Sequence, residues 1–224
     1  MDGTVPQLIS IKKDIKQKYL DKAQMLRQLY DKAGVKVYEF LGSPGSGKTS
    51  VIEALVDRLK DKYKILYLGG DVASTLDAER VEKHGIDAIE INTGGICHLE
   101  PDHIFEALKN VDLSKYDIVF IENVGNLICP FSFPLGAHKR IMIVSVAEGE
   151  DKFIKHPTST RVSDIIVISK VDLADKIGVN VEKMKEDAKS LNPKAPVVEV
   201  STVTGQGIDD LIKVMELPQK VESV

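Results

Sequence analysis

The stretch from Val37 to Ser50, VYEFLGSPGSGKTS, constrains the fold more than any other part of this 224-residue chain. The apolar run from Val37 to Leu41 predicts a buried strand, and the apolar spacing from Val51 to Leu59 predicts a helix. Between them, residues 42–49 match G-x-x-x-x-G-K-S/T at every fixed position. A strand, a glycine-rich turn and a helix in this order predict a phosphate-binding loop and, with it, a P-loop NTPase fold.

The predicted phosphate site uses backbone N–H groups, one ammonium group and one hydroxyl group. Glycines let the N–H groups converge on an anion without a Cβ atom in the way. The helix N-terminus adds a partial positive charge. We expect Lys48 to reach the β- and γ-phosphates and the Thr49 hydroxyl to ligate Mg²⁺. The residues expected to bind nucleotide here are Gly42, Ser43, Pro44, Gly45, Ser46, Gly47, Lys48, Thr49 and Ser50.

The composition argues against several classes of protein. A formal net charge of -4 lacks the basic excess of a nucleic-acid-binding domain, so no nucleic-acid partner is expected. The sequence contains no apolar run of about 18 residues, which argues against a membrane span. The charged N-terminus lacks the apolar core of a signal peptide, so we expect a cytoplasmic protein. Two cysteines do not suggest a disulfide framework in that setting; core packing, metal binding or reactivity must explain them.

Apolar patterns predict alternating strands and helices along the chain. A first helix over residues 7–33 is expected to cover the domain or, less commonly, to bind a partner. The later strands are expected at 64–68, 88–92, 117–121, 140–146, 165–169 and 197–200, with helices near 77–84, 100–111, 181–191 and 208–215. This alternation predicts an α/β fold with a mainly parallel sheet, helices on both faces and an N-terminal helix in front of it.

Two segments after predicted strands indicate a guanine nucleotide. Ser169-Lys170-Val171-Asp172 resembles the N-K-x-D element of GTPases, in which the Asp carboxylate accepts two guanine N–H groups and rejects adenine. Ser169 replaces the usual Asn that ties this loop to the P-loop. Residues 201–205, STVTG, resemble the loop whose backbone N–H contacts guanine O6. We expect GTP rather than ATP, with Lys170, Asp172, Ser201 and Thr202 at the base. Residues 1–34 are then a helical appendage and 35–224 one P-loop GTPase domain.

The predicted hydrolysis centre follows the strand DIVFI. Glu122-x-x-Gly125 stands where signalling GTPases have D-x-x-G, whose carboxylate holds Mg²⁺ and whose glycine amide contacts the γ-phosphate. Asp71 and Asp77 follow the second strand; we assign Asp77 to Mg²⁺ and Asp71 to the attacking water, with helix capping as the alternative. No arginine lies in the P-loop, so slow intrinsic hydrolysis is expected. The expected catalytic residues are Lys48, Thr49, Asp71 and Glu122, and the expected Mg²⁺ ligands are Thr49, Asp77 and Glu122.

The adjacent Cys97 and His98 and the distant Cys129 suggest a second metal site. All three residues are predicted to lie on loops, and two thiolates with one imidazole suit Zn²⁺ or Ni²⁺ rather than Mg²⁺. Three ligands do not complete a tetrahedral structural zinc site. A fourth ligand would have to be water, His103 or a residue of a second subunit. The alternative is that each cysteine is a small buried hydrophobic residue.

Six segments together resemble the HypB family, the GTPases of nickel insertion in nickel–iron hydrogenase maturation: GSPGSGKT, INTGGICHLE, IENVGNLICP, VSVAEGEDK, SKVDL and STVTGQG. The resemblance covers essentially the whole chain. It implies a GTP-dependent homodimer of the SIMIBI class, with Cys97, His98 and Cys129 as the metal ligands. It also implies a hydrogenase large-subunit precursor and a companion nickel chaperone as partners. The sequence has neither the N-terminal Cys-rich motif nor the His-rich tract of some members, so nickel storage is not implied.

The combined expectation is a metallochaperone that hydrolyses GTP to GDP and phosphate, binds nickel or zinc, and assists nickel insertion into a hydrogenase precursor. Its metal affinity is expected to change with the bound nucleotide. The alternatives are a urease accessory nickel GTPase, an ATP-dependent small-molecule kinase with a structural zinc, and a non-catalytic zinc-binding module. The SKVD segment argues against the kinase. Urease accessory GTPases typically carry Cys-Pro-His, whereas Cys97 is followed directly by His98.

Overall fold

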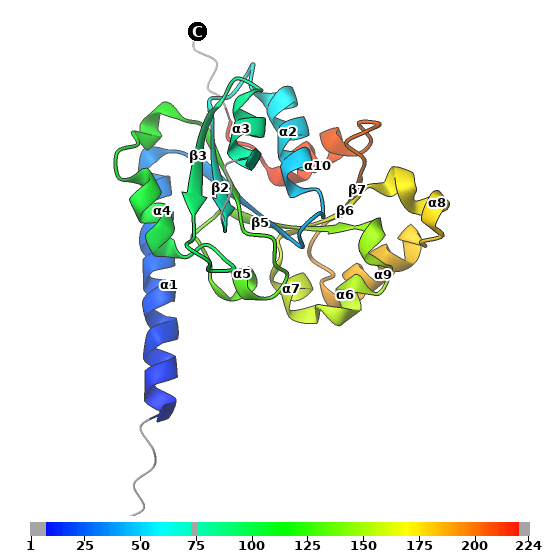
Figure 1. The fold of residues 1–224 in the computed structure, drawn as a ribbon, viewed down its shortest axis with the longest axis horizontal. Coiled ribbons are helices and arrows are strands. Elements are labelled where there is room, and N and C mark those ends of the chain that lie inside the picture. Colours follow the sequence, from blue (N-terminus) through cyan, green and yellow to red (C-terminus); the bar gives the residue numbers. More distant parts are fainter. Residues whose placement is uncertain (1–7, 73–75, 220–224) are drawn as a thin grey trace, which may run out of the picture.

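The computed structural model describes residues 8–72 and 76–219, and in them one parallel sheet forms the centre of the molecule (Figure 1). Its seven strands have the order β3-β2-β4-β1-β5-β6-β7, and every neighbouring pair is parallel. The strands are β1 Lys36–Gly42, β2 Ile65–Asp71, β3 Asp87–Asn92, β4 Ile118–Glu122, β5 Lys139–Ser145, β6 Ile165–Ser169 and β7 Val197–Val200. The predicted α/β fold with a parallel sheet is confirmed.

The helices expected from sequence periodicity are present, and four short helices were not predicted. The helices are α1 Leu8–Ala33, α2 Lys48–Leu59, α3 Leu76–Glu82, α4 Pro101–Leu108, α5 Cys129–Ser132, α6 Lys152–Lys155, α7 Pro157–Val162, α8 Ala174–Ile177, α9 Val181–Leu191 and α10 Ile208–Met215. Helices α5 to α8 have only four or six residues, too few for a periodic apolar pattern. The predicted loop position of Cys129 is wrong, because Cys129 begins α5, where Pro130 suits a first turn.

The sheet is covered on both faces because successive side chains of each strand point to opposite sides. On one face, Tyr38 and Phe40 of β1 pack edge-to-face against Phe120 of β4, under α2, α3 and α10. On the other face, one apolar cluster lies under α1 and α4, and another lies under α5, α6, α8 and α9. The central strands β1, β4 and β5 are therefore buried over most of their length, as the apolar runs predicted.

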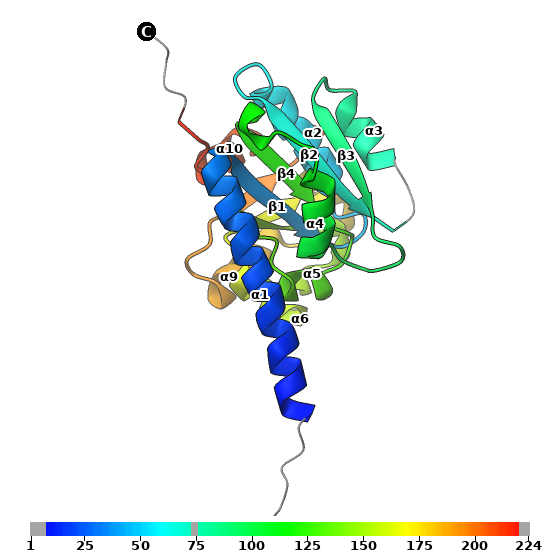
Figure 2. The same cartoon turned by 90° about the vertical axis from the view of Figure 1, so that its left-hand side faces the viewer.

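Helix α1 lies across the sheet beside α4 and extends beyond the body of the domain (Figures 1 and 2). Leu26 and Tyr30 are buried, and the Tyr30 hydroxyl donates to the carbonyl of Leu135 at 3.1 Å. Lys22 forms a 2.6 Å ion pair with Asp102 of α4. The predicted covering role is met by this half of the helix. Nothing is described of the side chains of residues 8–16 at the start of this helix.

The carboxyl ends of the parallel strands meet at one edge, where ligands bind in open α/β sheets. The P-loop follows β1, Asp71 ends β2, Glu122 ends β4 and Lys170 follows β6. Across residues 8–72 and 76–219, none of the helices combines the length and apolar character that crossing a bilayer requires.

Candidate functional site

The P-loop has the backbone conformation that its glycines predict. Gly45 and Gly47 adopt φ angles of +74° and +94°, a region that other residues rarely occupy. Gly47 immediately precedes α2, so the N-terminal amides of this helix open toward the loop. The Lys48 ammonium lies 3.3 Å from the carbonyl oxygen of Ser43. Burial lowers the pKa of Lys48, and the nearby Glu122 carboxylate opposes that shift.

The β4 carboxylate, Glu122, directly contacts the P-loop helix. Its Oε1 accepts a hydrogen bond from the Thr49 hydroxyl at 2.9 Å, and its Oε2 accepts one from the Tyr67 hydroxyl at 2.8 Å. Burial raises the pKa of Glu122, while Lys48 opposes the shift. A carboxylate beside a hydroxyl oxygen is a donor set suited to Mg²⁺. When bound, Mg²⁺ would neutralise charge developing on the β- and γ-phosphate oxygens.

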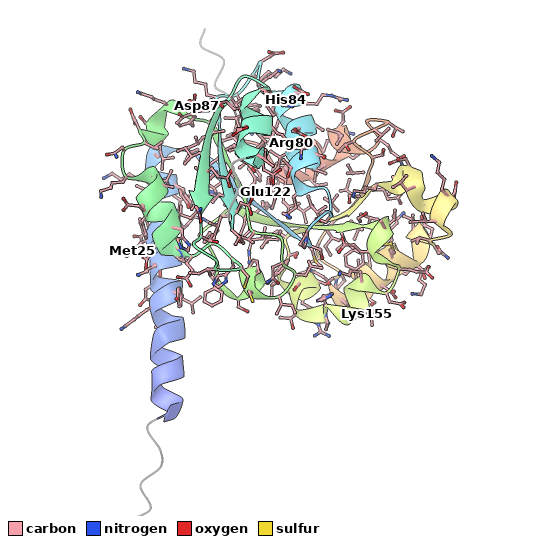
Figure 3. All side chains as sticks on the ribbon, in the orientation of Figure 1. Met25, Arg80, His84, Asp87, Glu122 and Lys155 are labelled. Atoms are coloured by element: carbon pink, nitrogen blue, oxygen red, sulfur yellow. The ribbon has the colours of Figure 1, made fainter. Side chains whose placement is uncertain are left out.

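One cavity of about 500 Å³ joins the predicted phosphate and hydrolysis residues. From the predicted set it is lined by Pro44, Gly45, Gly47, Lys48, Thr49, Ser50, Asp71, Asp77, Glu122, Gly125 and Lys170. It is also lined by Gly70, Val72, Arg80, Asn123 and Val124, which sequence reasoning did not select. Figure 3 labels Arg80 on α3 and Glu122 at the end of β4, both at this cavity. Asp77 and Asp71 thus lie close enough to share a site with the P-loop lysine.

Arg80 is the one missed side chain that carries a cationic group into the cavity lining. Its guanidinium pairs with Glu53 of α2 at 2.6 Å and lies 3.4 Å from both the Ser50 hydroxyl and an Asp77 carboxylate oxygen. The available sequence signal was the spacing of Asp77 and Arg80, because residues three apart on a helix share one face.

The predicted base-binding loop, residues 169–172, is attached to the P-loop by two side chains. The Ser169 hydroxyl donates to the carbonyl of Ser46 at 2.5 Å, and the Lys170 ammonium donates to the carbonyl of Gly45 at 2.7 Å. Ser169 therefore makes the contact with the P-loop that an Asn side chain usually makes in GTPases. The Ser201 hydroxyl donates to Asp172 Oδ1 at 2.6 Å, which joins the two predicted base-site segments. Asp172, Ser201 and the exposed Thr202 lie outside the cavity lining.

Cys97, His98 and Cys129 come together although the second cysteine is distant in sequence. One ligand atom from each lies within 4.8 Å of the other two, the sole such group found in the described parts of the chain. Cys97 Sγ and His98 Nδ1 are 3.8 Å apart. Ligands of a tetrahedral zinc site, about 2.0–2.3 Å from the metal, are separated by about 3.3–3.8 Å. Small movements would therefore let these donors share one ion.

The environment of this cluster is apolar on one side and open on the other. The His98 ring stacks on Phe133 with a centroid distance of 4.1 Å, and Cys97 is exposed. His98 Nε2 is 3.3 Å from Glu100 Oε1, a contact that becomes an ion pair only when the imidazole is protonated. Burial lowers the pKa of His98, and a hydrogen bond with Cys97 raises the pKa of the Cys129 thiol.

His103, which the sequence suggested as a possible fourth metal ligand, caps the start of α4 in the structure. Its Nδ1 accepts a hydrogen bond from the backbone N–H of Glu100 at 3.0 Å, which completes a capping box at the start of α4. His103 is not part of the ligand cluster found among the described residues. Water and a second subunit remain as sources of a fourth ligand.

The loop between β4 and α5 belongs to both sites. Glu122 and Gly125 line the nucleotide cavity, and Cys129 is four residues beyond Gly125. A Cβ atom on Gly125 would lie 3.0 Å from the backbone of Pro44, so this loop packs directly on the P-loop. Asn126 then accepts a hydrogen bond from the backbone N–H of Cys129 at 3.3 Å. Only three residues therefore separate the part of this loop that packs on the P-loop from Cys129 of the ligand cluster.

Comparison with known proteins identifies relatives over nearly the full length of the chain. The family model "CobW/HypB/UreG, nucleotide-binding domain" matches residues 36–199. The "Probable hydrogenase maturation factor HypB" of Methanocaldococcus jannaschii is 47% identical over 209 residues, which cover 93% of this chain and 95% of that protein. The "Hydrogenase/urease maturation factor HypB" of Helicobacter pylori is 41% identical and covers 89% of this chain and 86% of its own length.

Two solved structures have the same fold and substantial sequence identity. The crystal structure of hydrogenase maturation factor HypB from Archaeoglobus fulgidus superposes with a TM-score of 0.82 and 43% identity, over 89% of this chain and all of that one. The crystal structure of HypB from Helicobacter pylori in complex with nickel gives a TM-score of 0.82 and 39% identity, over 92% and 100% of the two chains.

Proposed function

Because this chain belongs to the HypB branch of the CobW/HypB/UreG family, we propose that it hydrolyses GTP to control nickel delivery to a hydrogenase precursor. One observation carries this proposal. The loop from Glu122 to Cys129 contributes a carboxylate to the nucleotide cavity and a thiol to the metal-ligand cluster. The same loop can therefore sense the phosphates at one end and change the metal coordination at the other.

Guanine preference rests on the hydrogen-bonded base loop. Asp172 is held by Ser201, and the segment before it is tied to the P-loop through Ser169 and Lys170. A carboxylate at this position accepts hydrogen bonds from two N–H groups of guanine. Adenine does not present a matching pair of donors there. We further propose that Lys48 and Thr49 bind the phosphates and the Mg²⁺ ion, with Glu122 and Asp77 completing the magnesium site. Asp71 is then in reach of the attacking water, since it lines the same cavity.

Nickel or zinc is the cargo that the ligand set favours. Two thiolates and one imidazole are softer donors than the oxygens that Mg²⁺ and Ca²⁺ prefer. The Helicobacter pylori relative was crystallised in complex with nickel, which supports the proposal that the present chain also binds nickel. The names of the Methanocaldococcus and Helicobacter relatives support a hydrogenase client, and the second name adds urease as a further possible client class.

Nucleotide state is proposed to set the metal affinity through Cys129. Loss of a γ-phosphate commonly releases the loop segments that contact it. If residues 122–129 move on hydrolysis, Cys129 withdraws from Cys97 and His98, and the metal loses a thiolate ligand. By thermodynamic linkage the metal must change the nucleotide affinity by the same factor. Typical couplings of about 1–3 kcal/mol correspond to roughly 5–150-fold changes in affinity.

A homodimer would complete the metal site. The apolar side chains of Ile96 and Ile128, which directly precede the two cysteines, are 39% and 65% exposed. Two exposed apolar residues beside an incomplete ligand set favour a second copy of the chain at this surface. We expect analytical ultracentrifugation to show a dimer when Ni²⁺ and a non-hydrolysable GTP analogue are present. A strict monomer at micromolar concentration with both bound would refute the shared site.

The delivery proposal is tested by nickel transfer. Protein loaded with one equivalent of Ni²⁺ is mixed with a hydrogenase large-subunit precursor and a companion nickel chaperone, and nickel on the precursor is measured. We expect transfer with GTP, little transfer with a non-hydrolysable analogue, and none from His98→Ala. His156→Ala is the matched control, because His156 lies in the turn between α6 and α7 outside the ligand cluster. Equal transfer by wild type and His98→Ala would contradict the proposal.

A further inference from the structure

Three polar residues form a buried network beneath the two sites, and we call it the Glu39 network: Glu39 of β1, Asn123 after β4 and Arg140 of β5. Glu39 is 0% exposed and Asn123 is 1% exposed. Sequence reasoning treated Glu39 as part of an apolar strand. A carboxylate in such a position is unfavourable unless it is paired and hydrogen-bonded.

Glu39 is the centre of the network and uses both of its oxygens. Its Oε1 accepts a hydrogen bond from Asn123 Nδ2 at 2.8 Å, and its Oε2 accepts one from Arg140 Nε at 3.1 Å. The two partners lie on opposite sides of β1, because Asn123 directly follows β4, Arg140 belongs to β5, and β4 and β5 are the neighbours of β1 in the sheet. Glu39 thus links the start of the β4–α5 loop to a residue of β5.

Each partner of Glu39 then holds the backbone beside a metal ligand. Asn123 Oδ1 accepts hydrogen bonds from the N–H of Leu99, the residue after His98, at 2.9 Å and from the N–H of Val124 at 3.0 Å. Arg140 Nη2 donates to the carbonyl of Pro130, the residue after Cys129, at 2.9 Å. Side chains of one network therefore contact the chain immediately after two ligands that come from different loops.

Arg140 makes a second pair of contacts at the same place. Its Nη1 donates to the carbonyl of Phe131 at 3.3 Å, and its guanidinium carbon lies 5.4 Å from the centroid of the Phe131 ring. The planar guanidinium group presents several donors in fixed directions, so it can hold two successive carbonyl groups of α5 at once. A lysine could not reproduce this arrangement.

We propose that Glu39, Asn123 and Arg140 are positioning residues that set the distance between the Cys97–His98 pair and Cys129. The inference rests on the proposed metal-binding function and adds residues that do not touch the metal. Asn123 directly follows Glu122, and its backbone N–H donates to the carbonyl of Phe40 at 3.0 Å. A displacement of Glu122 at the nucleotide therefore acts on the same residue that anchors Leu99. The network is the route by which nucleotide state reaches both halves of the ligand cluster.

A purely structural role would make the network a stabilising element without influence on the metal. The chain offers a matched control in Asn192, another buried asparagine. Its Nδ2 donates to the carbonyls of Thr160 and Ser163 at 2.9 Å, and its Oδ1 accepts from the N–H of Ala195. Truncation of Asn192 and of Asn123 removes the same kind of buried contacts, but only Asn123 is connected to the metal ligands.

The experiment compares wild type, Glu39→Gln, Asn123→Ala and Asn192→Ala. Ni²⁺ affinity is measured by calorimetry with GDP and with a non-hydrolysable GTP analogue, and unfolding is followed by urea titration. Glu39→Gln is nearly isosteric and lies outside the nucleotide cavity, so it guards against a folding failure of Asn123→Ala. Outer-shell partners of metal ligands typically change metal affinity by about 10–100-fold. We expect a loss of that size in Glu39→Gln and Asn123→Ala, together with a smaller ratio of the affinities in the two nucleotide states.

Asn192→Ala should lose stability but bind Ni²⁺ with the wild-type affinity and the wild-type nucleotide ratio. Wild-type Ni²⁺ affinities in both folded network variants would overturn the positioning role and leave the proposed function intact. Failure of the wild-type protein itself to bind Ni²⁺ would instead contradict the proposed function. In the absence of metal, the GDP affinity of Glu39→Gln should stay at the wild-type value, because Glu39 itself is not part of the cavity lining.

Discussion

Asp172→Asn should exchange the base preference of this protein. Asp172 Oδ1 accepts a hydrogen bond from the Ser201 hydroxyl, whose oxygen in turn accepts one from the N–H of Thr204 at 3.2 Å. In the variant the amide oxygen is therefore expected to face Ser201, and the new NH₂ group to face the base. There it would meet the donor groups of guanine, whereas xanthine offers an acceptor in place of the exocyclic amine.

The magnitude follows from the loss of one charge-assisted hydrogen bond, about 1.5–3 kcal/mol. That corresponds to roughly 10- to 150-fold weaker binding of GDP. Calorimetry with GDP, xanthosine diphosphate (XDP) and ADP avoids turnover and measures the affinity of the protein for each of the three nucleotides. We expect a weaker GDP affinity, a gain for XDP and no change for ADP. Asp175→Asn, at an exposed position three residues away in α8, is the matched control. An unchanged GDP affinity in Asp172→Asn would remove this residue from the base site.

Two further predictions concern charged groups of the nucleotide cavity and its border. Lys48→Ala should weaken the free energy of nucleotide binding by about 1.5–3 kcal/mol and should release almost no phosphate from GTP. Hydrolysis of GTP at the wild-type rate would contradict the proposed role of Lys48 in the P-loop. Burial, with the carboxylates of Asp71, Asp77 and Glu122, raises the pKa of Glu90 to about 7 from an ordinary value of 4.5. The folded protein thus binds an extra proton between these values, so its stability falls as pH rises through that range. In thermal melts without nucleotide, Glu90→Gln should therefore be more stable than wild type at pH 8 but not at pH 4. The same difference in melting temperature between variant and wild type at both pH values would contradict the raised pKa of Glu90.

The order of elements, and the residues of the candidate nucleotide site that line one cavity, could be predicted largely from local patterns. The strands at 165–169 and 197–200 and the helices at 181–191 and 208–215 have the predicted bounds. The two strands are short, mainly apolar runs, and the two helices are long enough for their apolar period to stand out. The clustering of P-loop, Asp71 and Glu122 followed from topology, since parallel strands present their carboxyl ends at one edge.

What the sequence did not reveal depends on partners that are distant along the chain. Glu39 resembles a polar interruption of an apolar strand until Asn123 and Arg140 are seen beside it. Arg80 becomes a cavity residue only when α3 is placed over the P-loop helix. Ser169 could be named as a substitute for Asn, but its bond to Ser46 required the two loops to be placed together. In each case the local sequence pattern does not say which residues from distant parts of the chain lie beside the side chain.

The most direct test of the central claim is a Ni²⁺ titration of the wild-type protein at fixed pH, with GDP and separately with a non-hydrolysable GTP analogue. The shared loop from Glu122 to Cys129 predicts affinities that differ by roughly 5–150-fold between the two states. The same titration on Cys129→Ala should give affinities that no longer depend on the nucleotide. Equal Ni²⁺ affinities of the wild-type protein in both nucleotide states would contradict the account.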